Sequence, residues 1–580
     1  MTQDAPMRDT APETAGVVAT GRARDADSEV TSAPALRITD LHIGFRSRRG
    51  LSTAVRGVSL EIARGETLAL VGESGSGKST TAAAVNRLLP DTAEISEGSI
   101  VVAGRDVAAL AQRELQALRG AGIGLVPQDP MTNLNPVMRV GDQIAEAFEV
   151  HDVATGSAAH DRAVELLEAV GIPDAATRAR QYPHEFSGGM RQRVLIAMGL
   201  ACKPALLIAD EPTSALDVTV QRRVLDLLDD LTDEMGTAVL LITHDLTLAA
   251  ERADRVAVMQ AGEIVEVGTA HDVMHAPQHD YTRRLLAAIP GTTATPRDLP
   301  GTAAGGPAGA AGGAAPVDAV APLVEVRDLV KVYGGGPGSH ALRGPAYAAV
   351  DGVSLTIPAG RTVSVVGESG SGKSTVANML LGLVEPTSGT VLVDGQEVGG
   401  GRKALKAVRR RIQPVFQNPY ASLDPRFTVG RSVAEPMGVH GIGDRASRRA
   451  HVAELLEQVA LPADVADRHP HQLSGGQRQR VAIARALSLE PDLVVLDEAV
   501  SALDVLVQQQ ILELLARLQS ELGLAYLFIS HDLAVVRMIS DEVHVMQRGK
   551  VVESGSPEAL FSSPQEGYTQ ELLSAIPKGA

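Results

Sequence analysis

A ten-residue stretch, VGESGSGKST, occurs twice in the chain, at Val71–Thr80 and Val366–Thr375. Its glycines let the backbone curl so that N–H groups face nucleotide phosphates, and the N-terminus of a following helix adds partial positive charge. The lysine can reach the outer phosphates and the serine after it can bind Mg²⁺. The sequence therefore predicts two phosphate-binding loops, formed by Gly72, Glu73, Ser74, Gly75, Ser76, Gly77, Lys78, Ser79 and Thr80, and by Gly367, Glu368, Ser369, Gly370, Ser371, Gly372, Lys373, Ser374 and Thr375.

Two adjacent carboxylates, Asp210-Glu211 and Asp497-Glu498, follow an apolar run in each half of the chain. One carboxylate can hold Mg²⁺ while the next polarises the attacking water, as metal-assisted phosphoryl transfer requires. His244 and His531 follow a further apolar run, and an imidazole there can hydrogen-bond a γ-phosphate and orient the water. An isolated pair or histidine would more often be structural, but matching places in both halves favour catalysis.

The same series of segments is written twice, in the same order. PQDP (127–130) matches FQNP (416–419), FSGGMRQR (186–193) matches LSGGQRQR (473–480), IADEPTSALD (208–217) matches VLDEAVSALD (495–504), and LITHDL (241–246) matches FISHDL (528–533). The last three pairs are each 287 residues apart, and the loop lysines are 295 apart. This period is far too long for a solenoid unit, so the pattern indicates a duplicated domain.

Apolar runs of strand length lead directly into these motifs, and helical stretches such as Ala163–Val170 and Val220–Leu231 separate them. Continuous apolar strands of this kind predict a parallel sheet covered on both faces, in an α/β fold. The motifs then lie at the carboxyl ends of parallel strands, where open α/β sheets bind ligands. The predicted strands are Thr67–Val71, Ala205–Ala209, Ala238–Thr243, Thr362–Val366, Leu493–Leu496 and Ala525–Ser530.

Composition excludes several classes of protein. The chain has 580 residues, 44% of them hydrophobic, so it is expected to fold, and its net charge of −17 argues against a nucleic-acid-coating protein. The single cysteine, Cys202, cannot form an internal disulfide or supply a structural zinc or iron–sulfur site. The N-terminus has no apolar core typical of a signal peptide. The longest apolar run, Val194–Ala209, is interrupted by Lys203 and Pro204, so no direct membrane span is predicted.

Composition also suggests the domain boundaries. A Gly-, Ala- and Pro-rich stretch predicts a flexible linker at 291–320, and a similar stretch predicts a disordered tail at 1–33. Two domains are expected at 34–275 and 321–562, with C-terminal extensions at 276–290 and 563–580. A Gly- and Pro-rich insertion at Gly334–Tyr347 in the second copy predicts an exposed hairpin loop.

Taken together, phosphate-binding loop, glutamine loop, S-G-G-x-R-Q-R signature, Asp-Glu, S-A-L-D and terminal histidine resemble the nucleotide-binding domains of ABC transporters. The resemblance implies two tandem P-loop ABC ATPase domains, each with a mostly parallel sheet core, an antiparallel β subdomain and a helical subdomain carrying the signature. It also implies hydrolysis of ATP with Mg²⁺. In this family the domains pack head to tail, and each ATP lies between the P-loop of one domain and the signature of the other.

Carried onto this chain, the resemblance implies two composite sites. The first joins Lys78, Ser79, Gln128, Asp210, Glu211 and His244 to Ser474, Gly475, Gly476 and Gln477; the second joins Lys373, Ser374, Gln417, Asp497, Glu498 and His531 to Ser187, Gly188, Gly189 and Met190. The glutamines would sense the metal and the water, and Mg²⁺ would be held by Ser79, Gln128 and Asp210, or by Ser374, Gln417 and Asp497. Asp217 and Asp504 would lie across the interface.

Aromatic residues near the start of each copy also resemble a family feature. Phe45 and Tyr333 each come shortly after an apolar run, Ala35–Ile38 and Leu323–Val326, and are expected to stack on adenine rather than serve as ordinary strand-end aromatics. Two departures from the pattern are Met190, where many signatures have Gln, and Ala499-Val500 in place of Pro-Thr. Neither removes a catalytic group, so both sites are expected to be competent.

The segments APQHDYTRRLLAAIP (276–290) and SPQEGYTQELLSAIP (563–577) resemble the C-terminal extension of peptide- and nickel-importer ATPases, although neither keeps the usual His-Pro pair. Each could instead be a simple packed helix capped by Thr282 or Thr569. The resemblance implies uptake of di- or oligopeptides, or of nickel, glutathione or another small solute. The implied partners are two transmembrane permease subunits and an extracytoplasmic solute-binding protein, at the cytoplasmic face of the membrane.

Two other classes of tandem ABC ATPase fit less well. Those that act on ribosomes typically have a long, charged, helical interdomain segment, unlike 291–320. DNA-repair ABC ATPases carry zinc-binding cysteines, which Cys202 alone cannot provide. No nucleic-acid partner is therefore expected.

Overall fold

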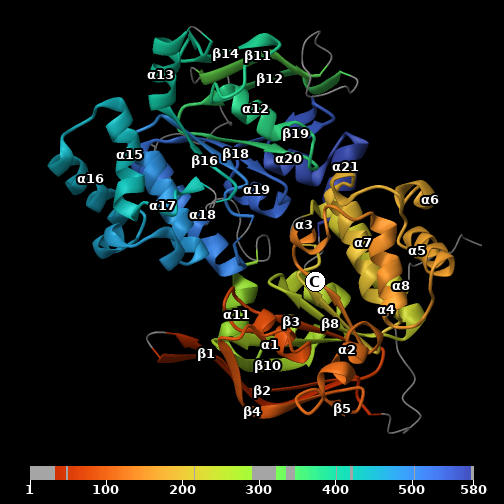
Figure 1. Cartoon of the computed structure of the whole chain (residues 1–580). Helices are drawn as coiled ribbons and strands as arrows, with labels where there is room; N and C mark the ends of the chain where they lie inside the picture. Colours follow the sequence, from red (N-terminus) through yellow and green to blue (C-terminus); the bar gives the residue numbers. More distant parts are fainter. Residues whose placement is uncertain are drawn as a thin grey trace, which may run out of the picture. The chain divides into compact units, whose positions relative to one another are not determined.

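A computed structural model describes residues 33–47, 50–213, 216–289, 322–334, 346–399, 401–418, 422–501 and 503–576. The predicted tail and linker lie outside the described residues, apart from Ala33, and so does the insertion, apart from its ends. The described residues from Pro34 onward belong to one compact unit. Within it the described part of the chain builds the same architecture twice (Figure 1).

The first copy contains an antiparallel sheet in the order β2-β1-β4-β5 and a six-stranded sheet in the order β10-β9-β3-β8-β7-β6. In the larger sheet all neighbours are parallel except β9 and β10. Its elements are β1 (Leu36–Ser47), β2 (Gly50–Ile62), β3 (Thr67–Val71), α1 (Lys78–Val85), β4 (Ala93–Val102), β5 (Arg105–Asp106), α2 (Gln112–Ala121), β6 (Ile123–Val126), α3 (Pro130–Asn133), α4 (Val140–Val150), α5 (Ser157–Ala169), α6 (Ala175–Arg178), η1 (Pro183–Glu185), α7 (Gly188–Leu200), β7 (Leu206–Asp210), α8 (Val218–Met235), β8 (Ala238–Thr243), α9 (Leu246–Arg252), β9 (Arg255–Gln260), β10 (Glu263–Thr269), α10 (Ala270–His275) and α11 (Asp280–Ala287).

The second copy repeats both sheets, in the orders β12-β11-β14-β15 and β16-β17-β18-β13-β19-β20. Its elements are β11 (Pro322–Tyr333), β12 (Tyr347–Pro358), β13 (Thr362–Val366), α12 (Lys373–Leu380), β14 (Ser388–Val393), β15 (Gln396–Glu397), α13 (Arg402–Arg411), β16 (Ile412–Val415), α15 (Val429–His440), α16 (Arg445–Gln458), η3 (Ala463–Asp467), η4 (Pro470–Gln472), α17 (Gly475–Leu487), β17 (Leu493–Asp497), α18 (Val505–Leu522), β18 (Ala525–Ser530), α19 (Leu533–Ile539), β19 (Glu542–Gln547), β20 (Lys550–Gly555), α20 (Pro557–Ser562) and α21 (Gly567–Ser574).

The parallel strands are apolar throughout because both faces of each large sheet are covered. In β3, Leu68 and Leu70 face a core shared with α1 and the antiparallel sheet, whereas Ala69 and Val71 face a core shared with the helical layer. Successive strand side chains point to opposite faces, so both sets must be apolar. The predicted parallel strands are confirmed, with their ends moved by at most one residue.

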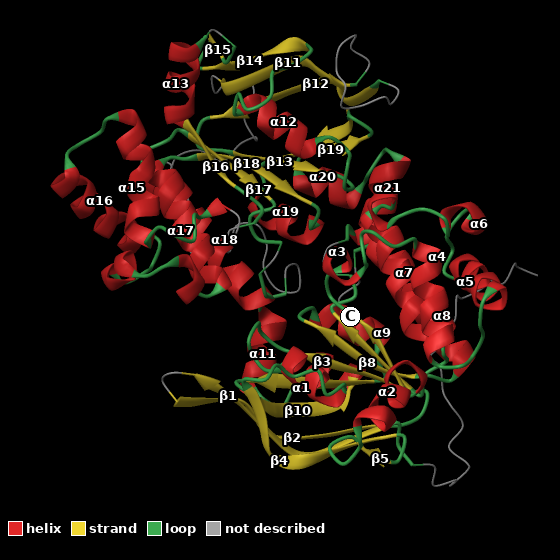
Figure 2. Ribbon diagram, in the orientation of Figure 1, coloured by secondary structure: helices red, strands yellow, loops and turns green. Residues whose placement is uncertain are grey.

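The signature-bearing helix of each copy packs within a helical layer (Figure 2). Helices α4, α5 and α7 contact one another, α7 contacts α8, and α15, α16, α17 and α18 repeat this arrangement. The predicted helical stretches 163–170 and 220–231 fall almost entirely within α5 and within α8. The fold class is therefore α/β, with two tandem domains that each combine a parallel-rich sheet, an antiparallel sheet and a helical layer.

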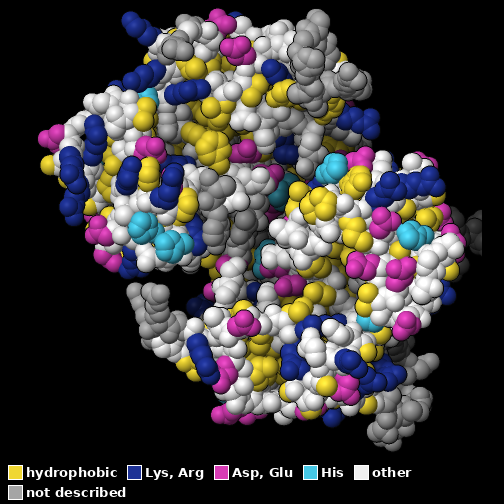
Figure 3. All heavy atoms as spheres, in the orientation of Figure 1, with side chains coloured by type: hydrophobic (Ala, Val, Ile, Leu, Met, Phe, Trp, Pro, Cys, Tyr) yellow, Lys and Arg dark blue, Asp and Glu magenta, His cyan; other side chains and the backbone are white. Residues whose placement is uncertain are grey.

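The two copies differ in surface charge. Helix α13 carries Lys403, Lys406 and Arg410 and no acidic residue, whereas its counterpart α2 includes Glu114. These basic side chains, with His440, line a shallow hollow of about 510 Å³. Figure 3 shows acidic and basic side chains interspersed over the remainder of the face in view.

Candidate active site

Each phosphate-binding loop joins the end of a central strand to a helix that begins at its lysine. Gly72 has φ 156° and a Cβ there would lie 2.1 Å from the Met259 carbonyl oxygen. Gly367 repeats this with φ 148° and 2.1 Å to the Met546 carbonyl oxygen. Only glycine fits so close a backbone approach. The loop conformation therefore depends on packing against β9 or β19 as well as on the loop sequence.

The loop lysines are buried and bound to their own loops. Lys78 Nζ donates to the carbonyl oxygens of Gly72 at 2.7 Å and Glu73 at 2.9 Å. Lys373 makes the same contacts in the second copy, at 2.7 and 2.8 Å. Burial lowers the pKa of both ammonium groups, although nearby carboxylates oppose this. Each lysine is thus held at the place where a phosphate would be bound.

Of the three residues predicted to hold Mg²⁺ in each copy, the serine and the aspartate contact each other, but the glutamine contacts neither of them. Ser79 Oγ donates to Asp210 Oδ1 at 3.2 Å, and Ser374 Oγ donates to Asp497 Oδ1 at 3.3 Å. Burial raises the pKa of both aspartates. A hydroxyl and a partly buried carboxylate are the hard oxygen donors that suit Mg²⁺ bound together with nucleotide phosphates. Gln128, the third predicted ligand, instead contacts the neighbouring glutamate.

The candidate catalytic glutamates are each held by a glutamine and a histidine. Gln128 Nε2 donates to Glu211 Oε2 at 2.6 Å, and His244 Nδ1 lies 3.2 Å from Glu211 Oε1. Three elements converge here: Glu211 follows β7, His244 follows β8 and Gln128 follows β6. Glu211 has φ 45°, a conformation that costs free energy in non-glycine residues and tends to occur at functional sites.

The second copy assembles the same group. Gln417 Nε2 donates to Glu498 Oε2 at 2.6 Å, His531 Nδ1 lies 3.5 Å from Glu498 Oε1, and Glu498 has φ 47°. Neither Ala499 nor Val500, where the first copy has Pro-Thr, displaces these side chains. The geometry of this group is thus nearly the same in both copies.

Each glutamate and histidine form an ion pair that shifts both pKa values. Burial raises the pKa of Glu211, but the hydrogen bond and charge of His244 outweigh it, and the pKa is lowered overall. Burial lowers the pKa of His244, but Glu211 outweighs it and raises the pKa. Glu498 and His531 shift in the same directions. The glutamate is therefore ionised, as a group that polarises water must be.

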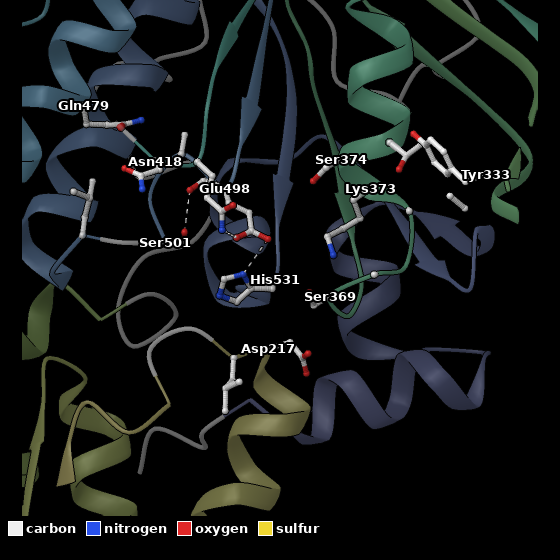
Figure 4. Close-up of a pocket in the computed structure, with 18 of the residues that line it drawn as sticks. Asp217, Tyr333, Ser369, Lys373, Ser374, Asn418, Gln479, Glu498, Ser501 and His531 are labelled. Atoms are coloured by element: carbon white, nitrogen blue, oxygen red, sulfur yellow. Dashed lines mark hydrogen bonds and ion pairs between the residues drawn. The ribbon is translucent and has the colours of Figure 1, made fainter. Parts of the chain in front are cut away.

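A cavity of about 810 Å³ lies over the second phosphate-binding loop (Figure 4). Lys373 and Ser374 face it from one side, and Glu498 and His531 face it from another. Asp217, which belongs to the first copy, also lines this cavity.

The cavity over the second loop does not bring in the signature of the first copy. The cavity is lined by Gly475 of the second copy's own signature, and its lining includes none of Ser187, Gly188, Gly189 and Met190. Within their own helices, Ser187 and Ser474 cap α7 and α17 by accepting N–H groups at 3.4 and 3.3 Å. The pairing of each loop with the opposite signature therefore stays a prediction.

The signature glycines and the residue after them differ in what they do. A Cβ on Gly189 would lie 2.5 Å from Val220 Cγ1, and one on Gly476 would lie 2.4 Å from Val507 Cγ1, so both glycines allow close helix packing. Gln477 Oε1 accepts the Ser474 N–H at 3.1 Å and closes a capping box. Met190 cannot form this hydrogen bond.

Asp217 and Asp504 each cap the start of a helix, and Asp504 also contacts the other copy. Asp217 Oδ1 accepts the Val220 N–H and Asp504 Oδ1 accepts the Val507 N–H, each at 3.0 Å. Asp504 Oδ2 also accepts the Ser74 N–H of the first loop at 3.4 Å. The predicted position of Asp504 at the interface therefore corresponds to a direct contact with the opposite loop.

The candidate adenine-stacking aromatics lie inside strands rather than after them. Phe45 is within β1 and Tyr333 ends β11, because both strands extend beyond their apolar starts by pairing with a neighbour on each side. Tyr333 is 40% exposed, lines the cavity and lies under Lys331 Nζ, 5.2 Å from the ring centroid. Phe45 is partly exposed and lines none of the described cavities.

The alternative that Thr282 and Thr569 cap the extension helices is wrong. The helices α11 and α21 begin earlier, at Asp280 and Gly567, and both threonines are buried within them. His279 caps α11 instead, accepting the Tyr281 N–H at 3.2 Å.

Sequence reasoning missed three side chains that contact the loops. The hydroxyls of Tyr281 and Tyr568 accept the backbone N–H groups of Glu73 and Glu368, and the Thr219 hydroxyl donates to Glu368 Oε1 at 2.6 Å. The tyrosines share one place in the two extensions, 287 residues apart, and that repetition was the available signal.

Comparison with known proteins agrees with this geometry. The family model described as ABC transporter matches residues 55–214 and 350–501, and the model described as oligopeptide/dipeptide transporter, C-terminal region, matches residues 265–310. The glutathione import ATP-binding proteins GsiA of Shigella dysenteriae serotype 1 (strain Sd197) and Escherichia coli (strain K12) are each 47% identical over 566 residues, covering 95% of this chain and 90% of the relative. GsiA of Salmonella typhimurium (strain LT2) is 46% identical with the same coverage. The chain belongs to the ABC transporter ATP-binding proteins and is an ATPase with two nucleotide-binding domains.

Proposed function

We propose that this chain is the ATP-hydrolysing subunit of an ABC importer that takes up glutathione or other short peptides. The observation that carries the ATPase half is the pair of assembled groups around Glu211 and Glu498, each beside a phosphate-binding loop. The solute half is supported by relatives named for glutathione import and by the match to an oligopeptide/dipeptide transporter C-terminal region. Glutathione is a tripeptide, so the two sources of support agree in chemical class.

The chemistry follows from the positions of the side chains. Lys78 and Lys373, already directed into their loops, bind the outer phosphates of ATP. Glu211 and Glu498 polarise the attacking water, while the glutamine and histidine on each carboxylate hold it in one orientation. Ser79, Asp210 and Gln128, or Ser374, Asp497 and Gln417, would hold Mg²⁺, which would neutralise charge on the phosphates; each glutamine would have to turn from its glutamate to do so.

The two copies act together in this proposal. The signature serines and glycines of one copy meet the γ-phosphate bound by the other, so ATP stabilises the closed pair and hydrolysis removes the contact. The contacts of Asp504 and Thr219 with the opposite loops support a shared interface. Opening and closing of this interface is the motion that would be passed to the transporter.

The proposed partners are two membrane-embedded permease subunits and an extracytoplasmic solute-binding protein. Within the described residues, no helix combines the length and apolar character needed to cross a bilayer. We place the chain at the cytoplasmic face of the membrane, bound to the permeases. Nickel complexes and other small solutes are the alternative cargo.

Reconstitution with the permeases and the binding protein in vesicles tests the function. We expect glutathione or short peptides in the vesicle-exterior compartment to stimulate ATP hydrolysis and to accumulate inside. The matched control is the double variant Glu211→Gln, Glu498→Gln, which should bind ATP but not drive accumulation. Stimulation by nickel complexes alone would contradict peptide import, and co-sedimentation with ribosomes in place of permeases would contradict import altogether.

A further inference from the structure

The C-terminal extension of each copy contacts the phosphate-binding loop of the same copy through one tyrosine. The hydroxyl oxygen of Tyr281 accepts the Glu73 N–H at 3.1 Å, and that of Tyr568 accepts the Glu368 N–H at 2.9 Å. Tyr281 is 1% exposed. Burial raises the pKa of Tyr568 to about 12, so its hydroxyl stays protonated at physiological pH.

The loop residue that binds each tyrosine through its N–H also binds the loop lysine through its carbonyl oxygen. Glu73 donates its N–H to Tyr281 and accepts Lys78 Nζ on its carbonyl oxygen at 2.9 Å. Glu368 stands in the same way between Tyr568 and Lys373, where the carbonyl contact is 2.8 Å. The tyrosine therefore fixes the loop residue that sets the position of the phosphate-binding lysine.

The tyrosines are themselves held firmly at the start of the extension helix. Glu266 on β10 accepts the backbone N–H groups of Gln278 and His279 at 2.7 and 3.1 Å. Glu553 on β20 repeats this with Gln565 and Glu566 at 2.8 and 3.2 Å. Because a charged acceptor binds two successive N–H groups, the helix start is anchored to the sheet that carries the loop.

The second extension also touches the first copy. Helix α21 contacts α8, where Arg223 Nη2 lies 2.7 Å from Glu571 Oε1 and the Arg222 guanidinium donates to the Ser574 carbonyl oxygen. The same helix α8 carries Thr219, whose hydroxyl donates to Glu368 Oε1 at 2.6 Å. Glu368 of the second loop is therefore contacted by Tyr568 of its own extension and by Thr219 of helix α8. The extension helix α21 in turn contacts α8.

The first loop has a related but different arrangement. Helix α11 contacts α18, and Leu506, which occupies the place of Thr219, packs against the same apolar core of the first copy as Leu286 and Ile289. Arg222 and Arg223 correspond to Gln509 and Gln510 in α18. The cross-copy ion pair therefore belongs to the second site, while the tyrosine contact belongs to both.

We propose that Tyr281 and Tyr568 are positioning residues for ATP binding, and that the second extension transmits the approach of helix α8 to its own phosphate-binding loop. The hydroxyls touch no reacting atom, so they act through the loop peptide and its lysine. The inference rests on ATP binding at the loops and is independent of the imported solute.

Tyr281→Phe and Tyr568→Phe, singly and together, test the positioning role in the full chain. Loss of one hydrogen bond to a loop N–H is expected to raise the KM and Kd for ATP about 3- to 10-fold, with a much smaller change in kcat. Kd is measured in the Glu211→Gln, Glu498→Gln background, where hydrolysis does not interfere. An unchanged KM and Kd in the double tyrosine variant would overturn the proposal.

Tyr526→Phe is the matched control. Tyr526 is buried and its hydroxyl donates to the Leu515 carbonyl oxygen, away from either loop. The same atom is removed, so this variant is expected to lower the Tm and to leave the KM for ATP unchanged. A comparable rise in KM for Tyr526→Phe would mean that the tyrosine effects report general destabilisation and would count against the positioning role.

Charge reversal tests the connection between the copies. In the Glu211→Gln background, where the second site carries the turnover, Arg223→Glu is expected to raise the KM for ATP, and Arg223→Glu with Glu571→Arg is expected to restore it. In the Glu498→Gln background the same changes should have little effect. Equal effects in both backgrounds, or failure of the exchanged pair to restore KM, would overturn the connection. Nucleotide binding is read without permeases, so a failure of the import assay leaves this test intact.

Discussion

At the scale of single residues, the chemistry centres on Glu211 and Glu498, each oriented by a glutamine and a histidine. Both glutamates adopt positive φ, at 45° and 47°. Such strain persists only where the surroundings hold the residue, and here the Glu211 N–H donates to Ile242 and the Glu498 N–H donates to Ile529, each at 2.9 Å. The carboxylates are therefore placed by neighbouring strands rather than by their own conformational preference.

We expect Glu211→Gln and Glu498→Gln each to slow ATP turnover severely at the altered site, because an amide cannot polarise the attacking water, while the other site continues to turn over. The loss at the altered site is expected to be about 10²- to 10⁴-fold. Steady-state phosphate release measures it, and ATP binding serves as the control for folding. Near-normal turnover in either single variant would show that its site contributes little to hydrolysis.

The ion pairs make stability depend on pH. The pKa of His244 and of His531 is raised in the folded chain, so their contribution is complete below their ordinary value of 6.5 and is lost as pH rises through the raised pKa. We expect the double variant His244→Asn, His531→Asn to lose more Tm, relative to the unaltered chain, at pH 6 than at pH 9. An equal loss at both pH values would contradict charged histidines in the ground state.

At the scale of elements, each phosphate-binding loop depends on its neighbours in the sheet. Alternate side chains of β3 fill two different cores, which fixes the strand end from which the loop starts. The loop then passes close to the backbone of β9, or of β19 in the second copy. Motif glycines therefore differ in importance according to what lies beside them.

We expect Gly72→Ala to destabilise the chain by about 2–4 kcal/mol, because its Cβ would lie 2.1 Å from the Met259 carbonyl oxygen in a strained conformation. A Cβ at Gly75 would have no neighbour within 4 Å, so the only cost of Gly75→Ala is the positive φ of 83°. We expect this variant to lose about 1–2 kcal/mol of stability. Denaturant midpoints and ATP binding measure both. Equal losses would mean that backbone strain, not the clash, dominates.

At the scale of the whole molecule, the two copies are alike in chemistry and unlike in their contacts with each other. Asp504 reaches the first loop, whereas Thr219 reaches the second, and only one cross-copy arginine–glutamate pair is present among the described residues. That pair is largely exposed, with side chains 70% and 52% accessible, and contributes less than about 1 kcal/mol to stability. Its proposed role is to connect helix α21 of the second copy to helix α8 of the first.

We expect each catalytic group to depend on the opposite signature. In the Glu498→Gln background, Ser474→Arg should abolish the remaining turnover, since Ser474 is predicted to complete the site of Glu211, whereas Ser187→Arg should add little. Phosphate release under saturating ATP measures this. The reverse pattern would indicate that each copy uses its own signature, as the cavity lined by both Gly475 and Lys373 would suggest.

The sequence by itself determined the duplicated domain, the parallel strands and the lysines, carboxylates, glutamines and histidines of both sites. These features are local: a glycine-rich loop, an apolar strand of five or six residues and the polar residue that follows each form one short string. Their side chains meet because the carboxyl ends of parallel strands share one edge of the sheet.

Only the tertiary structure decided which distant residues support the loops. Tyr281 bonds a residue 208 positions earlier, and Thr219 bonds one 149 positions later in the other copy. It also corrected the helix caps, because Thr282 and Thr569 fit the capping pattern but are buried inside longer helices. Separation along the chain carries no information about distance once helices pack on sheets. These contacts depend on how each extension helix is seated, which no local string specifies.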